Sequence, residues 1–362
     1  PGLITAPFSG FYGDPFVSAI ALTSDNSVIV GCWFETIQGE PRKHVVRLMQ
    51  DGRVDAGFDT GVGPNDVVYA VSIQDDRKVL IGGAFTNVNG VASHYLARLN
   101  ADGRLDRTFE NVLEFGPSSA GLVRAIMIQP DGGILVGGSF RSRVCCFRDI
   151  IRLHPDGRLD TSFVPDAGIV SVYQIARQAD GKILLTGASN LARLNSNGVQ
   201  DASFKPDLLR EFSSDFVAVL GNGQILVAGS YPFRERNTVV RLNSDGSLDP
   251  SFNTDVQGSG AMLIQRDGKL LIAGISSVDG VSRTGVARLN GVWTTSLGVS
   301  RLNGGTVRLH ISGPASEKLT VQSSTNLKDW SQIIMLANPE TPLDLDFATA
   351  QAKQKFYRTI SE

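Results

Sequence analysis

A short segment that recurs along the chain limits what this sequence can fold into. It appears as RLMQDGRVDAGF, RLNADGRLDRTF, RLHPDGRLDTSF, RLNSNGVQDASF and RLNSDGSLDPSF, each beginning with Arg-Leu and ending in Phe. A sixth copy keeps Arg288, Leu289 and Asn290 and then loses the rest. Successive arginines of these copies are separated by 41 (193 − 152) to 54 (152 − 98) residues. A period of this size indicates a repeat architecture.

Each copy follows two strand-like runs, for example VYAVSI and then KVLIGGAF, or VRAIMI and then GILVGGSF. Asp-Gly or Asn-Gly separates the two runs in four repeats, and such dipeptides reach the positive φ of tight hairpin turns. A repeat therefore reads as strand A, a tight turn, strand B, a variable loop, strand C, an Asp-Gly turn and a short strand D that ends in Phe. Four antiparallel strands in roughly 45 residues are typical of one blade of a β-propeller.

The N-terminus supplies the piece that the last repeat lacks. Phe8 lies 50 residues (58 − 8) before Phe58, so Ile4–Phe8 matches a strand D with no strands A to C before it. A strand from each end of the chain in one blade would close the ring and remove its free edges. We expect an all-β fold, a six-bladed β-propeller closed by an N-terminal strand and followed by a small β-sandwich. The expected repeats are 16–66, 67–121, 122–168, 169–213, 214–259 and about 1–15 plus 260–293, with the β-sandwich at 294–362.

Residues that recur in every repeat are expected to build the frame, because a single active site needs asymmetry. We expect the second glycine of strand B (Gly83, Gly138, Gly187, Gly229 and Gly274) to permit close packing of blades. The strand-D phenylalanines are expected between blades. The arginine before strand D is expected to pair with the aspartate of the Leu-Asp that follows, for example Arg98 with Asp106.

These motifs resemble the bacterial delta-60 repeat, a β-propeller family of unknown function. The resemblance rests on Gln74–Phe85 with Ala97–Phe109 and on Gln129–Phe140 with Ile151–Phe163. From about Thr294 the segment at Gln322–Trp330 and the triplet Phe356-Tyr357-Arg358 resemble a small β-sandwich at the C-terminus of secreted proteins of Verrucomicrobia-type bacteria. Both resemblances imply a protein that is secreted or held at the surface of a bacterium.

Bulk properties exclude several classes of protein. Lys and Arg number 34 against 36 Asp and Glu, a net charge of −2 that predicts no nucleic-acid partner. The sequence contains no run of 18 apolar residues, so we expect no membrane span. The sequence has no GxSxG, P-loop, HExxH or CxxC motif, and its four histidines fall in non-equivalent positions. We therefore expect no cofactor and no metal site.

The variable loops are the candidate binding surface. In a propeller the D–A and B–C loops share one face, and variable loops on a rigid frame are where binding usually resides. Three D–A loops carry an aspartate at the same offset from the strand-D phenylalanine: Asp166, Asp207 and Asp255. The B–C loops are basic and include Arg42, His44, Arg141, Arg143, Arg148, Arg234 and Arg236. An acidic mouth inside a basic rim suits an anionic polysaccharide or a protein partner.

Two functions from different classes remain open at this point. One is a non-catalytic binding or scaffold module. The other is a polysaccharide hydrolase or lyase that uses the three aspartates as general acid and base. Propellers host both classes, so the fold alone does not decide, and the absence of a catalytic motif favours the binding module.

Overall fold

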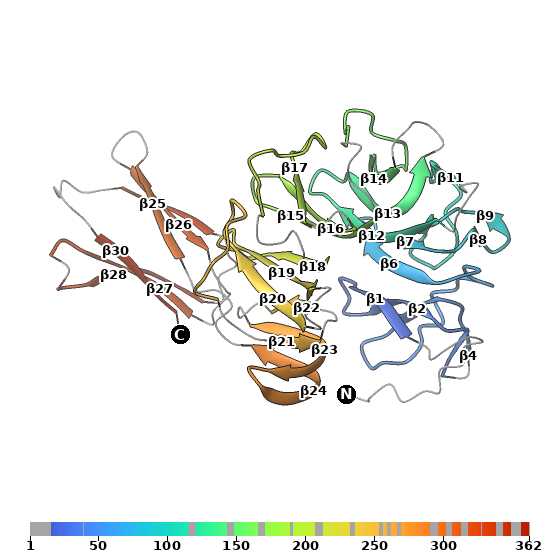
Figure 1. Cartoon of the computed structure of the whole chain (residues 1–362), viewed down its shortest axis with the longest axis horizontal. Coiled ribbons are helices and arrows are strands. Elements are labelled where there is room, and N and C mark those ends of the chain that lie inside the picture. The colour runs from blue at the N-terminus through green and yellow to red at the C-terminus, as the bar shows by residue number, and fades with distance from the viewer. Residues whose placement is uncertain are drawn as a thin grey trace. The chain divides into compact units, whose positions relative to one another are not determined.

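The computed structural model of the chain is built from β-strands (Figure 1). It describes residues 16–38, 40–114, 121–142, 148–165, 171–188, 191–206, 213–231, 236–252, 256–258, 262–265, 269–289, 296–301, 306–312, 318–326, 328–337, 343–348 and 356–361. Every regular element in these ranges is a strand. The chain divides into two compact units, Pro1–Ala202 and Ser203–Glu362, which we describe separately. In the described ranges no helix has the length and apolar character needed to cross a membrane.

The strands follow the repeats. In the first unit they are β1 (Phe16–Leu22), β2 (Val28–Trp33), β3 (Thr36–Ile37), β4 (Glu40–Pro41), β5 (Val45–Leu48), β6 (Val68–Ile73), β7 (Val79–Gly83), β8 (Asn87–Val88), β9 (Val91–Ala92), β10 (Leu96–Leu99), β11 (Leu113–Glu114), β12 (Leu122–Ile128), β13 (Ile134–Ser142), β14 (Arg148–Leu153), β15 (Val172–Arg177), β16 (Ile183–Gly187) and β17 (Ala192–Leu194). In the second unit they are β18 (Ser213–Val219), β19 (Ile225–Tyr231), β20 (Arg236–Leu242), β21 (Val256–Gly258), β22 (Met262–Ile264), β23 (Leu270–Val278), β24 (Val281–Leu289), β25 (Ser296–Arg301), β26 (Thr306–Ser312), β27 (Lys318–Ser324), β28 (Ser331–Ala337), β29 (Leu343–Ala348) and β30 (Phe356–Ser361).

Each repeat forms one antiparallel sheet with strand B in the middle. The orders β1-β2-β5, β6-β7-β10, β15-β16-β17 and β18-β19-β20 all read A-B-C. Strand D is shorter than expected, because it is reduced to one bridge, such as Leu99 with Leu105. The chain turns directly after that bridge: the amide of Phe58 donates to the carbonyl of Asp55, and the Asp55 carboxylate accepts from the amide of Gly57. The outer edge of each sheet is therefore a capped turn.

The core lies between successive sheets. One apolar cluster joins Ile29 and Phe58 of the first repeat to Val68 and Val79 of the second. Another joins Leu135 and Phe163 of the third repeat to strands of the fourth. Phe58 and Phe163 are each 1% exposed, which confirms that the strand-D phenylalanines pack between repeats. Sheets packed face to face in series bury apolar side chains on both sides, as in a propeller.

The two glycines of strand B have different roles. A Cβ on the first of them, Gly82, would lie 2.4 Å from the Val123 side chain of the next repeat, so this position sets how closely the sheets approach. A Cβ on the second, Gly83, would lie 2.0 Å from the carbonyl oxygen of Val67 in its own sheet. The expectation that the second glycine serves contact between blades is therefore corrected: that role belongs to the first.

A recurring arginine ties each sheet to its own turn. Its Nε lies 2.7–2.8 Å from an aspartate Oδ2 in the pairs Arg47–Asp55, Arg98–Asp106, Arg152–Asp160, Arg193–Asp201 and Arg241–Asp249. The expected pairing is thus confirmed. The same guanidinium lies over the strand-D phenylalanine, at 4.8 Å for Arg98 over Phe109. It also reaches the next repeat, because Arg98 Nη1 donates to the carbonyl of Pro155 at 2.5 Å.

The region after the last repeat holds two three-stranded antiparallel sheets, β25-β26-β29 and β28-β27-β30. Val307, Leu309 and Ile311 of β26 share an apolar cluster with Val321 of β27. The alternation of buried and polar positions in VRLHI and LTVQS therefore corresponds to strands, as the sequence predicts.

Candidate functional site

The structure describes some of the residues of the predicted binding surface. Asp166, Asp207 and Asp255 lie outside the described residues, as do Arg143 and Arg234. Arg148 and Arg236 are described by their backbone alone, at the starts of β14 and β20. The acidic mouth and most of the basic rim thus stay predictions, and Arg42, His44 and Arg141 are the three residues whose side chains are described.

Arg141 is the described residue that fits the predicted rim. Its side chain is exposed near the end of β13. Arg148 lies opposite it in the β13–β14 register, and Glu114 of β11 lies opposite it on the other side. The backbone register thus pairs two arginine positions at the end of this hairpin, with a glutamate position on the neighbouring strand.

Arg42 is half-buried, and its Nη1 donates to the carbonyl of Pro41 at 2.9 Å. Its Nε is enclosed, and the structure gives it no hydrogen-bond partner among the described residues. Buried polar groups are normally paired, so this enclosed Nε is an exception. The role of Arg42 as a contact residue of the loop face stays a prediction.

His44 does not lie on the exposed rim. It is 5% exposed and its ring stacks on Trp33, with 5.4 Å between the ring centroids. Its φ of 61° lies in the left-handed region, as do those of Tyr95 (63°) and Asp149 (66°) at the equivalent positions of the next two repeats. Its backbone links strand B to strand C, because the amide of Cys32 donates to its carbonyl. His44 is thus a buried corner residue.

Burial of His44 predicts a pH-dependent stability. Burial lowers its pKa below the usual 6.5 and outweighs the attraction of Asp66 and Glu35. The unfolded chain then binds the proton more readily, so the stabilising contribution is complete above pH 6.5 and is lost as pH falls below it. We expect His44→Asn, which tolerates positive φ, to flatten the pH dependence of the free energy of unfolding below pH 6.5. Urea unfolding at a series of pH values measures this, and equal pH profiles for both proteins would contradict it.

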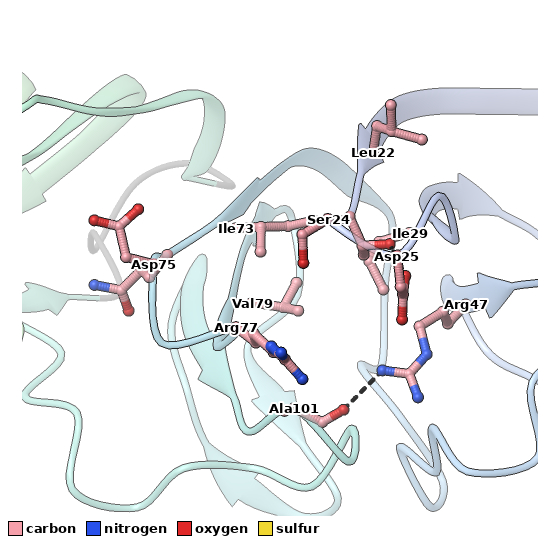
Figure 2. Close-up of a pocket in the computed structure, with 12 residues that line it drawn as sticks. Leu22, Ser24, Asp25, Ile29, Arg47, Ile73, Asp75, Arg77, Val79 and Ala101 are labelled. Atoms are coloured by element: carbon pink, nitrogen blue, oxygen red, sulfur yellow. Dashed lines mark hydrogen bonds between the residues drawn. The ribbon is translucent and has the colours of Figure 1, made fainter.

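A pocket of about 600 Å³ opens at the other end of the sheets, between the A–B turns of the first two repeats (Figure 2). Arg47 lines it and donates through Nη1 to the carbonyl of Ala101 at 2.8 Å, the contact drawn in Figure 2. Asp25 accepts hydrogen bonds from the hydroxyl of Thr23 and the amide of Ser27, which hold its pKa at about 2. Two of the charged side chains that line the pocket, Arg47 and Asp25, are therefore engaged by the protein itself.

The pocket follows from two substitutions in the first repeat. The second repeat has Gln74 and Lys78, whose side chains reach Pro155 of the next repeat and Asp106. The first repeat has the shorter Thr23 and Ser27 at these positions, and Thr23 bonds locally to the carbonyl of Ser27. The space that longer side chains fill elsewhere is left open. We assign the pocket to the frame.

A row of bulged residues on strand A went unrecognised in the sequence. The register of strand A on strand B skips one residue in each of the first five repeats: Ser18, Tyr69, Arg124, Tyr173 and Asp215. A bulge re-aims a side chain and is common beside functional sites. The signal in the sequence is the second residue of the runs VYAVSI, VRAIMI and VYQIAR, which changes between Tyr and Arg.

Neighbouring bulges meet within the first unit. Strand β12 packs between β6 and β15. The guanidinium carbon of Arg124 lies 5.5 Å from the centre of the Tyr69 ring and 5.1 Å from that of Tyr173. Both distances are within the range of a cation–π interaction. The bulges therefore place a cation between two aromatic rings.

Within the part of the chain that the structure describes, no group of three or more His, Cys, Asp or Glu side chains could hold a metal ion.

The sheets packed in series define a β-propeller repeat protein, and comparison with known families agrees. The sequence matches the model of a family described as a beta-propeller domain of unknown function (DUF5122), over residues 23–58, 74–109, 129–163, 178–204, 220–252 and 265–295. These stretches make up more than half of the chain, so the chain belongs to this β-propeller family. A comparison with curated proteins finds no match.

Solved structures give distant similarities. The extracellular domain of BT4673 from B. thetaiotaomicron is 9% identical at a TM-score of 0.47, over 94% of this chain and 52% of that one. The chain thus spans about half the length of that structure. The gluconolactonase XC5397 from Xanthomonas campestris is 14% identical at a TM-score of 0.42, over 70% and 81% of the two chains. Regucalcin from Agrobacterium tumefaciens, a calcium-binding protein, is 13% identical at a TM-score of 0.43, over 74% and 92%.

Proposed function

We propose that this chain is a non-catalytic binding or scaffold module, secreted or at the bacterial cell surface, whose ligand is an anionic polysaccharide or a protein. One observation carries the proposal. The residues that recur are engaged in the frame, as in the Arg98–Asp106 pair, whereas the bulged position of strand A differs from repeat to repeat. Different side chains at one position of a fixed frame form a surface that is free to specify a ligand.

The charge of two exposed side chains supports an anionic ligand. They are Arg124 of β12 and Arg141 near the end of β13. The aspartates Asp166, Asp207 and Asp255 and the arginines Arg143, Arg148, Arg234 and Arg236 complete the proposed surface. Basic groups around a polar surface attract anionic polymers, and this attraction weakens as salt screens it.

Retention on an array of anionic and neutral glycans, at low and high salt, tests the function. We expect retention of anionic glycans that falls with salt, and no shortened products. Cleavage products would replace the binding module by an enzyme and direct mutagenesis to the three aspartates. Loss of all glycan retention together with no protein partner captured at the loop face would contradict the proposal.

We also propose that the propeller has six blades and that Ile4–Phe8 completes the last one. The exposed face of β1 supports this closure. Val17 is 48% and Ile20 66% exposed, whereas Val68, which holds the place of Val17 in the second repeat, is 0% exposed. Val68 is buried because it packs on Gly31 of the preceding repeat.

Deleting residues 1–15 tests the closure. We expect the melting temperature to fall, by about 1–2 °C for each kcal/mol lost in a chain of this size, because the last blade loses its outer segment. Phe8→Ala alone should give part of the same loss. An unchanged melting temperature in both variants would contradict the closure.

The region 294–362 is proposed to be the small β-sandwich of the resemblance, which attaches or displays the propeller. Its support is the cluster that β26 and β27 share through Leu309 and Val321. Expression of residues 294–362 alone, followed by circular dichroism, tests it: a cooperative β-rich unfolding transition is expected, and an unfolded fragment would contradict it.

A further inference from the structure

The contacts of Arg124 differ from those of the recurring arginines that hold the sheets together. Its strand neighbours supply Tyr69 from β6 and Tyr173 from β15, with ring centres 5.5 and 5.1 Å from its guanidinium carbon. In four repeats the recurring arginine lies over one phenylalanine and binds an aspartate, as Arg98 does. Arg124 differs from them because two rings from two different repeats contact it.

The hydrogen-bonding groups of these three side chains are unused within the described residues. The structure gives the Arg124 guanidinium no ion pair or hydrogen bond there, and it gives none to the hydroxyls of Tyr69 and Tyr173. Arg124 is exposed and both tyrosines are half-buried. An arginine has five N–H donors in a planar fork, so its capacity for an anion is intact.

The flanking rings favour one kind of anion. A cation–π contact uses none of the N–H donors of a guanidinium, and the edge of that group presents two parallel N–H donors. A planar carboxylate accepts both of them in a bidentate pair. The tyrosines also limit the motion of the arginine, which reduces the entropy lost on binding.

We propose that Arg124, flanked by Tyr69 and Tyr173, binds the carboxylate of a uronic acid residue in an acidic polysaccharide. This inference rests on the proposed binding function and names its ligand class and contact residues. The two phenol hydroxyls favour a sugar over an acidic peptide. A uronate has hydroxyl groups beside its carboxylate that can pair with them, whereas an aspartate or glutamate side chain has methylene groups there.

Calorimetric titration of α-1,4-linked trigalacturonate into the full chain tests the site. We expect wild type to bind it and not to bind its methyl ester, which has the same sugars without the charge. Arg124→Gln should weaken binding by at least about tenfold, because it removes a charge-assisted bidentate pair. Arg124→Lys should also weaken binding, because lysine keeps the charge and lacks the fork.

The control is Arg104→Gln, which removes an exposed arginine at the turn between strands C and D, at the other end of the sheet. It should leave the affinity within about twofold, as expected for a distant, screened charge. Tyr69→Phe and Tyr173→Phe keep the rings and should each lower affinity through loss of a hydroxyl. Unchanged melting temperatures of the Arg124 variants would show that folding is intact.

Several outcomes would overturn the inference: no binding of trigalacturonate by wild type, equal affinity of Arg124→Gln, full affinity of Arg124→Lys, or equal binding of a triglutamate peptide. In these cases retention of another glycan on the array would leave the proposed function standing and remove this site alone. Absence of any retained glycan or captured protein would instead remove the proposed function.

Discussion

Replacing Asp106 by alanine is expected to lower the free energy of unfolding by about 3–5 kcal/mol, because it leaves a buried cation without its partner. The side chains of Arg98 and Asp106 are 7% and 5% exposed, and Lys78 Nζ lies 3.0 Å from the same carboxylate oxygen. Asp106 also accepts from the hydroxyl and the amide of Thr108. Urea unfolding of wild type and variant measures the loss.

The same unfolding experiment at acid pH tests whether the charge of the Asp106 carboxylate causes the loss. Burial alone would raise the pKa of Asp106, but the bonds from Thr108, Lys78 and Arg98 outweigh it and hold the pKa well below the usual 3.8. The carboxylate therefore stabilises the fold fully above pH 3.8, and its contribution is lost as pH falls below that value. The difference between wild type and Asp106→Ala should shrink in acid.

Glu110→Ala is the matched control for the buried pair. Glu110 lies 3.5 Å from Arg158, and the two side chains are 50% and 71% exposed. An exposed pair contributes less than about 1 kcal/mol, so the variant should unfold close to wild type. Equal losses in Asp106→Ala and Glu110→Ala would contradict a stabilising role for the recurring buried pair.

Gly83→Ala is expected to destabilise the protein by about 3 kcal/mol, or to prevent folding, because the added methyl meets backbone. Its Cβ would lie 2.0 Å from the carbonyl oxygen of Val67, an atom that cannot move without disturbing strand A. Gly83 also lies opposite Val68, beside the bulge at Tyr69. Thermal unfolding of the variant measures the effect.

Gly133→Ala provides the comparison. A Cβ there would lie 3.2 Å from the ends of the Asp131 and Gln129 side chains, which can shift, and other repeats carry Lys78 and Lys182 at this position. The variant should stay within about 1 kcal/mol of wild type. Repeat 1 keeps its bulge with Cys32 at the position of Gly83, so equal tolerance of Gly83→Ala and Gly133→Ala would show that strand A adjusts there too.

The repeating part of the fold could be predicted from the sequence. Residues that return in each repeat belong to the frame, because a single functional site would not recur. Strands A, B and C, the packing of Phe58 and the pair Arg98–Asp106 follow from residues that return in each repeat. The short strand D expected from the sequence is reduced to a single bridge, such as Leu99 with Leu105. Its short run is interrupted by an aspartate such as Asp55, whose carboxylate accepts from the amide two residues on and favours a turn.

The candidate site was less accessible, for two physical reasons. A bulge is a shift of one residue in register, and a pattern of alternating residues does not reveal which residue is skipped, so Tyr69, Arg124 and Tyr173 read as ordinary strand positions. The burial of His44 depends on its stacking with Trp33, a contact between two strands that charge alone does not indicate. Loop length and charge predicted a basic rim, and they indicated neither the bulges of strand A nor the burial of His44.

Hydroxyl-radical footprinting with and without polygalacturonate tests the central claim most directly. The claim is that a frame of recurring residues displays a binding row at the bulges of strand A. Tyr69 and Tyr173, both half-buried, are predicted to be labelled less when polygalacturonate is present, while the half-buried Tyr357 of β30 is labelled equally in both states. Equal labelling of Tyr69 and Tyr173 in both states would contradict the account.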